Sequence, residues 1–284
     1  MIKKKYNDKE QWFIYHANLR TKTLVVIGLA IVIILSIFIS GYFIRDIPTN
    51  FVNAMQMPSL EHLFGTDWMG RDMFQRTIAG LGLSIMVGFI ASVVSTIISI
   101  ILGLFSSFNK FADEVVAGII DLFSSIPHIL LIILVSMMFG GGVYGVIMGV
   151  GLTHWTPLAR VLRSEVKEIM TKEYISLSEN LGRNKVWIAI KHIFPLIISQ
   201  IIVGVILMFP HAIMHEAAIT FLGFGLPPHE PAIGVILAES MHYLSSGCWW
   251  LAFYPGLSLL LVVLLFDLIG ENVEKLLNPE TAQE

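Results

Sequence analysis

The 284-residue sequence has very little cysteine and little charge. Its single cysteine, Cys248, excludes an intrachain disulfide and any cysteine-based zinc or iron–sulfur site. Charged residues make up only 14% of the chain, compared with about 25% in soluble domains, and residues 77–109 contain none. Because a soluble fold of this length cannot hide so long an uncharged run, the sequence indicates an integral membrane protein. The mean hydropathy of +0.76 agrees.

The sequence also lacks a nucleotide-binding loop and an excess of basic residues. It contains no Gly-x-x-x-x-Gly-Lys-[Ser/Thr] stretch, the pattern whose backbone N–H groups cradle phosphates. The pairs Gly80/Gly82 and Gly223/Gly225 are interpreted as turn or packing glycines. The net charge is −3, so nothing favours a nucleic-acid partner. We therefore expect this chain not to be an enzyme, and any ATP-driven step to need another subunit.

What the chain has is long apolar stretches. A transmembrane helix needs about 20 apolar residues, and six stretches approach that length: residues 24–44, 84–104, 115–139, 143–158, 193–214 and 249–268. The first follows three lysines, as a signal peptide would, but it exceeds a signal core and shows no small-residue cleavage site, so a membrane anchor is predicted. The predicted fold class is all-α integral membrane, with about six transmembrane helices in residues 23–272.

The positive charges predict the orientation of these helices, because cytoplasmic loops carry an excess of Lys and Arg. Fifteen of the 18 Lys and Arg residues fall in the two termini and the even-numbered connections, and the other three are Arg45, Arg71 and Arg76. We therefore expect residues 1–22, residues 273–284 and the loop 159–192 to lie in the cytoplasm. The segment 211–248, which contains no Lys or Arg, is expected to face outward.

The loop 159–192 mixes basic side chains with apolar residues at helical spacing, which predicts a pair of amphipathic helices. Glu173 opens the second helix, and Gly182 is expected to cap its C-terminus. A solvated intracellular loop is the alternative. Because the predicted apolar face would be exposed, a surface for a partner protein is favoured.

This loop resembles the coupling loop of ATP-binding-cassette (ABC) importer permeases. Glu173, Gly182, Ile190 or Ile193, and Pro195 fall in matching places, although Leu177 and Ser178 stand where alanines are usual. The resemblance extends over residues 20–279. It is most specific for the second permease type of the dipeptide/oligopeptide/nickel import family, and the stretches that carry it are residues 63–76, 215–228, 249–256 and 278–279.

The resemblance implies a type I ABC importer permease fold in the bacterial cytoplasmic membrane. It implies as partners a second permease subunit, two cytoplasmic ATPases that hold ATP and Mg, and an extracytoplasmic solute-binding protein. Glu173, Tyr174, Leu181 and Gly182 would then dock on an ATPase. No catalytic residue and no cofactor is expected in this subunit.

Histidines are the candidate metal-binding residues of this sequence. His211 and His215 are four residues apart, so a continuing helix would place both on one face, and imidazole pairs suit nickel, cobalt, copper or zinc. With Met208, Met214 and Glu216 nearby, this pair is predicted to contact a metal transiently. Ordinary interface histidines are the alternative. Nickel, cobalt or a metal chelate is therefore favoured as substrate, with dipeptides or oligopeptides as the alternative.

Three further ionisable residues, Asp121, His128 and His154, fall in or near the third and fourth apolar stretches. Together with His211, His215 and Glu216 they are candidates for the translocation pathway, because charges inside a membrane usually face a bundle interior or a cavity. The alternative for Asp121 is a position near the cytoplasmic interface of the membrane, outside the pathway. An intramembrane metalloenzyme built on His211, His215 and Glu216 is a weaker alternative, since His-x-x-x-His-Glu matches neither zincin pattern. A stand-alone secondary transporter is the other alternative.

Overall fold

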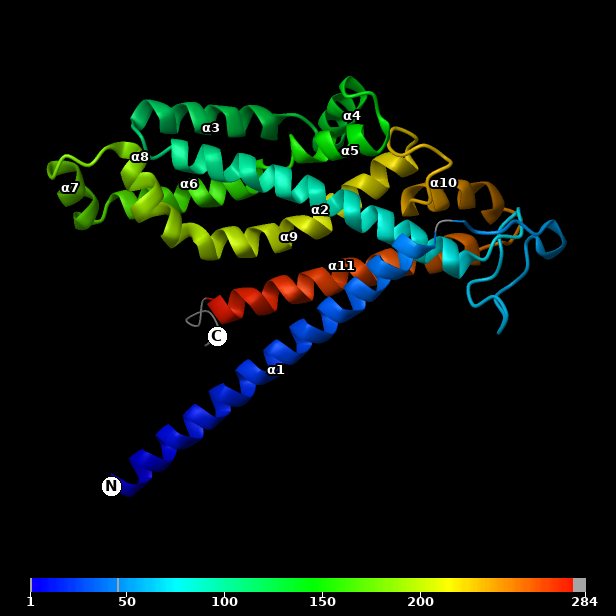
Figure 1. Cartoon of the computed structure of the whole chain (residues 1–284), viewed down its shortest axis with the longest axis horizontal. Helices are drawn as coiled ribbons and strands as arrows, with labels where there is room; N and C mark the ends of the chain where they lie inside the picture. The colour runs from blue at the N-terminus through cyan, green and yellow to red at the C-terminus, as the bar shows by residue number, and fades with distance from the viewer. Residues whose placement is uncertain (1, 45, 278–284) are drawn as a thin grey trace.

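The computed structural model of the chain describes residues 2–44 and 46–277, with side chains from Arg20 onward. Within these residues the regular structure is helical, and the only β-type contact is an isolated bridge between Thr66 and Asp72. Figure 1 shows an elongated bundle of helices. The all-α membrane class is confirmed. Arg45, the pair Asn278-Pro279 and most of the predicted tail lie outside the described residues.

Four described helical segments are long and apolar enough to cross a bilayer. They are α1 (Ile2–Phe43) from Arg20 onward, α2 (Met73–Phe105), α11 (Trp250–Leu277), and a continuous run of α8 (Lys185–Ile188), the π-helical turn η2 (Ala189–Ile193) and α9 (Phe194–Phe221). The bent pair α3 (Lys110–Ser125) and α4 (His128–Met138) counts as a fifth span if the two helices cross together.

The third and fourth predicted stretches are both interrupted. α3 and α4 meet at 97° across Ile126 and Pro127, because the proline disfavours helical backbone at the residue before it. The stretch 143–158 is divided between α5 (Gly142–Gly151) and α6 (Thr156–Met170), with a turn from Leu152 to Trp155. The four long segments and the bent pair of α3 and α4 give at most five spans. The predicted count of about six is reached only if α5 and α6 also cross the membrane together.

The fifth predicted stretch is longer in the structure than in the sequence analysis. α9 continues through Pro210 to Phe221, since a proline removes one backbone hydrogen bond and need not end a helix whose neighbours hold it. His211, His215 and Glu216 consequently lie inside α9. They do not belong to the segment that follows it.

The short elements gather at the two ends of the bundle (Figure 1). One end carries α7 (Glu173–Asn180), toward which the C-terminal part of α11 runs. The other carries η1 (Phe51–Asn53), the segment from residue 46 to 72, and α10 (Ile233–Leu244). The structure therefore separates the predicted coupling loop from the predicted outward segments by the length of the bundle.

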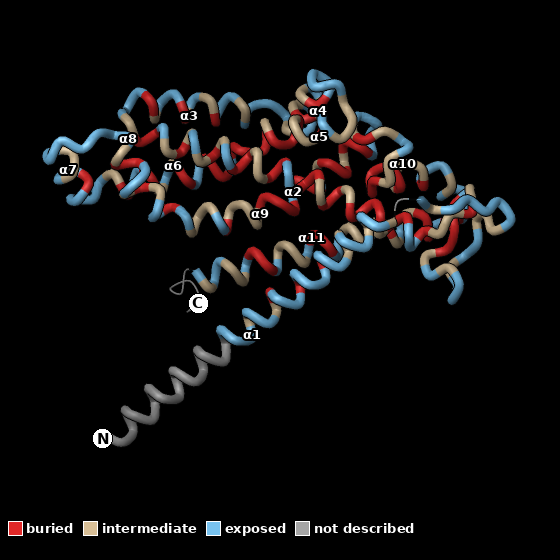
Figure 2. The backbone as a smooth tube through the Cα atoms, in the orientation of Figure 1, coloured by how far each residue is buried: buried red, intermediate tan, exposed pale blue. Residues whose placement is uncertain are grey.

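Small residues allow the long helices to pack closely. A Cβ on Gly88 in α2 would lie 2.6 Å from Cγ1 of Ile213 in α9, and one on Gly41 in α1 would lie 2.6 Å from the carbonyl oxygen of Ile78. Glycine at such contacts is typical of membrane helix interfaces. Figure 2 shows buried residues along the centre of the bundle, whereas most of the described part of α1 is exposed.

Candidate functional site

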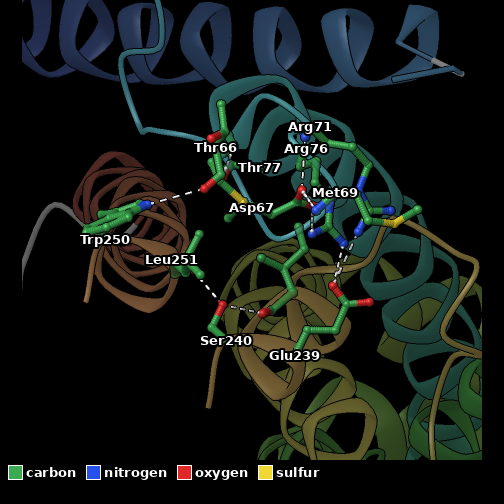
Figure 3. A network of polar contacts seen from close by, with 12 residues as sticks. Thr66, Asp67, Met69, Arg71, Arg76, Thr77, Glu239, Ser240, Trp250 and Leu251 are labelled. Atoms are coloured by element: carbon green, nitrogen blue, oxygen red, sulfur yellow. Dashed lines mark hydrogen bonds and ion pairs between the residues drawn. The ribbon is translucent and has the colours of Figure 1, made fainter. Parts of the chain in front are cut away.

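A buried network of charges organises the end of the bundle that carries α10 (Figure 3). Asp67 is 2% exposed. Its Oδ1 accepts hydrogen bonds from the backbone N–H groups of Met69 at 2.8 Å and Arg71 at 2.9 Å. Its Oδ2 accepts from Nε of Arg71 and Nη1 of Arg76, both at 2.7 Å. The carboxylate is thus fully partnered, as a buried charge must be.

Arg76 extends this network to α10. Its Nη2 donates a 2.8 Å hydrogen bond to Oε2 of Glu239 in α10. Next to it, the Ser240 hydroxyl donates to the carbonyl oxygen of Leu251 at 2.7 Å, and the Trp250 indole donates to that of Thr66 at 3.4 Å. These contacts join the segment before α2 to α10 and α11. They give a physical reason for the motif at residues 63–76, whose residues could not be assigned individual roles from the sequence.

A cluster of histidines lies where α4, the turn after α5, and α9 meet. Nε2 of His128 is 3.1 Å from Nδ1 of His154, and one ring nitrogen from each of His128, His154 and His215 lies within 4.8 Å of the others. His211 approaches the same group, with its ring centroid 5.9 Å from that of His154. We call these four residues the histidine cluster.

Three separate elements position the histidine cluster. His128 is the first residue of α4, directly after the Pro127 break. His154 lies in the turn between α5 and α6 and is 7% exposed. His211 and His215 lie one turn apart on α9. The structure thus brings together four of the six predicted pathway residues.

The other two predicted pathway residues lie elsewhere. Glu216 is completely buried, and its Oε1 accepts a 3.0 Å hydrogen bond from the Thr220 hydroxyl. Successive helix residues point about 100° apart, so Glu216 is directed away from its neighbour His215, and it is not one of the three grouped ligands. Asp121 is exposed on α3, and its Oδ1 lies 3.9 Å from Nη2 of Arg160.

A cavity of about 460 Å³ adjoins the histidine cluster. His154 and His211 line one part of it, and Leu158, Gly204, Met208 and Gln200 line much of the rest. Glu274 near the end of α11 also borders this cavity. Two of the histidines therefore face open space that a small solute or ion can enter.

The predicted coupling residues lie on and just after α7. Gly182 has a φ of +80°, its N–H donates to Glu179, and the N–H of Arg183 donates to Ser178. These two bonds form a Schellman cap, so the predicted helix C-terminus at Gly182 is confirmed. Ile175 is the buried residue of α7, and it packs with Val166 and Ile169 of α6.

The outer face of α7 is apolar and exposed. Tyr174 is 40% exposed, Leu177 59% and Leu181 74%, while Glu173 is exposed at the N-terminus of the helix. A hydrogen bond to Glu168 raises the pKa of Lys172, just before α7. Such a solvent-facing apolar patch is typical of a protein-binding surface.

Comparisons with known proteins agree with this architecture. Residues 95–279 match the family described as binding-protein-dependent transport system inner membrane component. The chain is 32% identical over 266 residues to the oligopeptide transport system permease protein OppC of Bacillus subtilis, covering 92% of this chain and 87% of that protein. It is also 32% identical over 284 residues to the dipeptide transport system permease protein DppC of Alkalihalophilus pseudofirmus, covering 97% and 92%.

A solved structure shows the same fold. A chain of the MetNI methionine ABC transporter, in an inward-facing conformation, superposes with a TM-score of 0.60 at 18% sequence identity. The match covers 72% of this chain and 98% of that chain. The predicted type I ABC importer permease fold is confirmed by this likeness.

Proposed function

Because the chain belongs to the family of binding-protein-dependent transport system inner membrane components, we propose that it forms half of the translocation pathway of a bacterial dipeptide or oligopeptide importer. The observation that carries the substrate class is the 32% identity to an oligopeptide permease protein over 92% of this chain. The dipeptide permease protein supports the same class. The peptide alternative therefore replaces nickel, cobalt or a metal chelate as the favoured substrate.

Permeases of this family work with ATPase and solute-binding partners. In the proposed complex, the exposed face of α7 docks on one of two cytoplasmic ATPases, which bind ATP and Mg. The opposite end, with α10 and residues 46–72, faces the solute-binding protein. A second permease subunit completes the pathway, and residues 1–22 and 273–284 lie in the cytoplasm. The long separation between α7 and α10 supports this division of partners.

The position of Glu216 weakens the metalloenzyme alternative. A metal-dependent hydrolase on α9 would need the carboxylate beside the imidazoles to serve as general base. The Glu216 carboxyl instead bonds to Thr220 and is not grouped with the histidines. A stand-alone secondary transporter is disfavoured by the family assignment.

Uptake by the reconstituted complex tests the proposed function. The chain is co-expressed with the second permease and the ATPases encoded beside it, placed in proteoliposomes, and supplied with its solute-binding protein. We expect ATP-dependent uptake of a labelled dipeptide or tetrapeptide, and no ATP hydrolysis by this chain purified alone. ATP-dependent uptake of nickel without uptake of either peptide would contradict the proposal.

A further inference from the structure

Peptide transport gives no role to three imidazoles whose ring nitrogens converge. The grouped atoms belong to His128, His154 and His215, which come from α4, the turn after α5, and α9. Helix spacing alone predicted a metal contact at His211 and His215, which share a helix face. The structure replaces that pair with a group that only the packing of distant segments creates.

The geometry of this group is close to that of a coordination site. Imidazole nitrogens bind zinc at about 2.0–2.1 Å, which separates two nitrogens of a tetrahedral site by roughly 3.4 Å. The His128–His154 nitrogens are already 3.1 Å apart, and the widest pair lies within 4.8 Å. Rotation of the rings by roughly an ångström at their tips closes the site, which is within ordinary side-chain adjustment.

The same contact specifies which nitrogens would bind. In the structure one of the two facing nitrogens must carry a proton to make the His128–His154 hydrogen bond. A metal ion takes both lone pairs instead, so the proton of the donor ring moves to its other nitrogen, and the two rings then carry their protons on Nδ1 of His128 and Nε2 of His154. Binding therefore exchanges one hydrogen bond for metal–nitrogen bonds, and the imidazole ligands stay neutral.

The ligand type restricts the ion. Carboxylate oxygens favour magnesium and calcium, whereas neutral imidazoles favour zinc, copper, nickel and cobalt. The three grouped ligands include no carboxylate. The adjoining cavity of about 460 Å³, which touches His154 and His211, supplies an entry route and room for a water or for His211 as the fourth ligand.

We propose that His128, His154 and His215 form a binding site for one divalent transition-metal ion of the zinc type, with His211 beside it. The ion is a bound ligand of the permease and not its transported substrate. An occupied site links α4, the turn between α5 and α6, and α9 through a single atom.

Cobalt binding to the assembled complex tests the proposal. The complex is purified without nucleotide through an affinity tag free of histidine, so that no added imidazole competes. Cobalt, whose visible absorption reports tetrahedral coordination, is titrated in and then displaced with zinc. We expect one cobalt per chain, displaced by zinc, with binding that weakens at acidic pH because the imidazoles must be neutral.

Single substitutions locate the ion. His154→Gln and His215→Gln are each expected to weaken metal binding by about 100-fold or more. Loss of a residue that only hydrogen-bonds to a metal ligand already costs about 10- to 100-fold, and these two residues would be ligands themselves. His242→Gln, on the exposed side of α10, is the matched control and should leave binding unchanged. A cobalt signal that survives in both cluster variants, or that is lost equally in the control, would overturn the proposal.

A second measurement does not depend on the variants folding. X-ray absorption of the zinc-loaded wild-type complex counts the imidazoles around the ion. Three or four imidazole nitrogens at about 2.0–2.1 Å support the site. Fewer than three, or a shell of oxygen ligands, would overturn it whatever the variants do.

Discussion

Arg76 at the start of α2 donates a 2.8 Å hydrogen bond to Glu239 in α10, which lies 163 positions later in the chain. Arg76 is only 4% exposed, and its other nitrogen is bonded to the equally buried Asp67. One guanidinium therefore connects the segment before α2 to α10 through a fork that lysine cannot reproduce. The contact makes the end of the bundle with α10 a single structural unit.

Arg76→Met is predicted to destabilise this end strongly. It removes one cationic partner from Asp67 and one from Glu239, and breaking a buried ion pair typically costs about 3–5 kcal/mol. Thermal unfolding of the purified complex measures the loss. Arg160→Met is the matched control, because its ion pair with Asp121 is exposed and should cost less than about 1 kcal/mol. Equal shifts in the two variants would contradict a structural role for the network.

Local sequence patterns predicted the helices of the loop 159–192 well. Gly182 caps α7 as expected, because a Schellman cap is decided by a few neighbouring residues and a glycine with positive φ. The apolar runs likewise predicted the membrane class and most of the long helices. The last turns of α9 were missed because the predicted stretch ends at Met214, where the polar residues His215 and Glu216 interrupt the apolar run, whereas the helix continues to Phe221.

The histidine cluster shows what local patterns leave out. His211 and His215 could be paired by helix spacing, but His128 and His154 reach them only through the 97° break before α4 and the turn after α5. The sequence predicts neither the angle of this break nor the path of this turn. The partner of Arg76 was equally hidden, since nothing near Glu239 indicates which of the distant arginines it meets.

Gly182→Val is predicted to impair coupling between ATP hydrolysis and transport. No other heavy atom would lie within 4 Å of a Cβ at this position, so the effect arises from the backbone, because a β-branched residue at φ +80° is strained by about 1–2 kcal/mol. Peptide uptake per ATP hydrolysed is the measurement. Gly182→Asn should retain most of the uptake, since asparagine tolerates this conformation. Full coupling by the valine variant would argue against α7 as the coupling helix.

Leu181→Asp is predicted to weaken ATPase binding. The side chain is 74% exposed just after α7, so the charge costs little in the isolated chain but would be buried unpaired in an apolar groove of the ATPase. Co-purification of the ATPase with the permease should fall at least about tenfold, which is about 1.4 kcal/mol. Ser176→Asp, exposed on α7, adds the same charge and serves as the control. Undiminished co-purification would place the ATPase contact elsewhere.

Cysteine labelling is predicted to place α7 and residues 46–72 on opposite sides of the membrane. Cys248 is 8% exposed, so Cys248→Ala provides a clean background at little cost. In intact cells an impermeant thiol reagent should label Leu60→Cys, where the native side chain is 98% exposed, but should not label Leu181→Cys until the membrane is permeabilised. The reverse pattern would invert the orientation indicated by the distribution of Lys and Arg.

Zinc is predicted to slow peptide uptake through the histidine cluster. An ion held by His128, His154 and His215 fixes three segments relative to one another, and alternating access requires packed segments to shift. Uptake into proteoliposomes should fall when zinc is added and recover with a chelator. His154→Gln should transport peptide without zinc and resist its inhibition, whereas His242→Gln should remain sensitive. If zinc binds the wild-type cluster and uptake is unchanged, then α4, the turn between α5 and α6, and α9 move as one body during transport. The conformational change must in that case occur at other contacts.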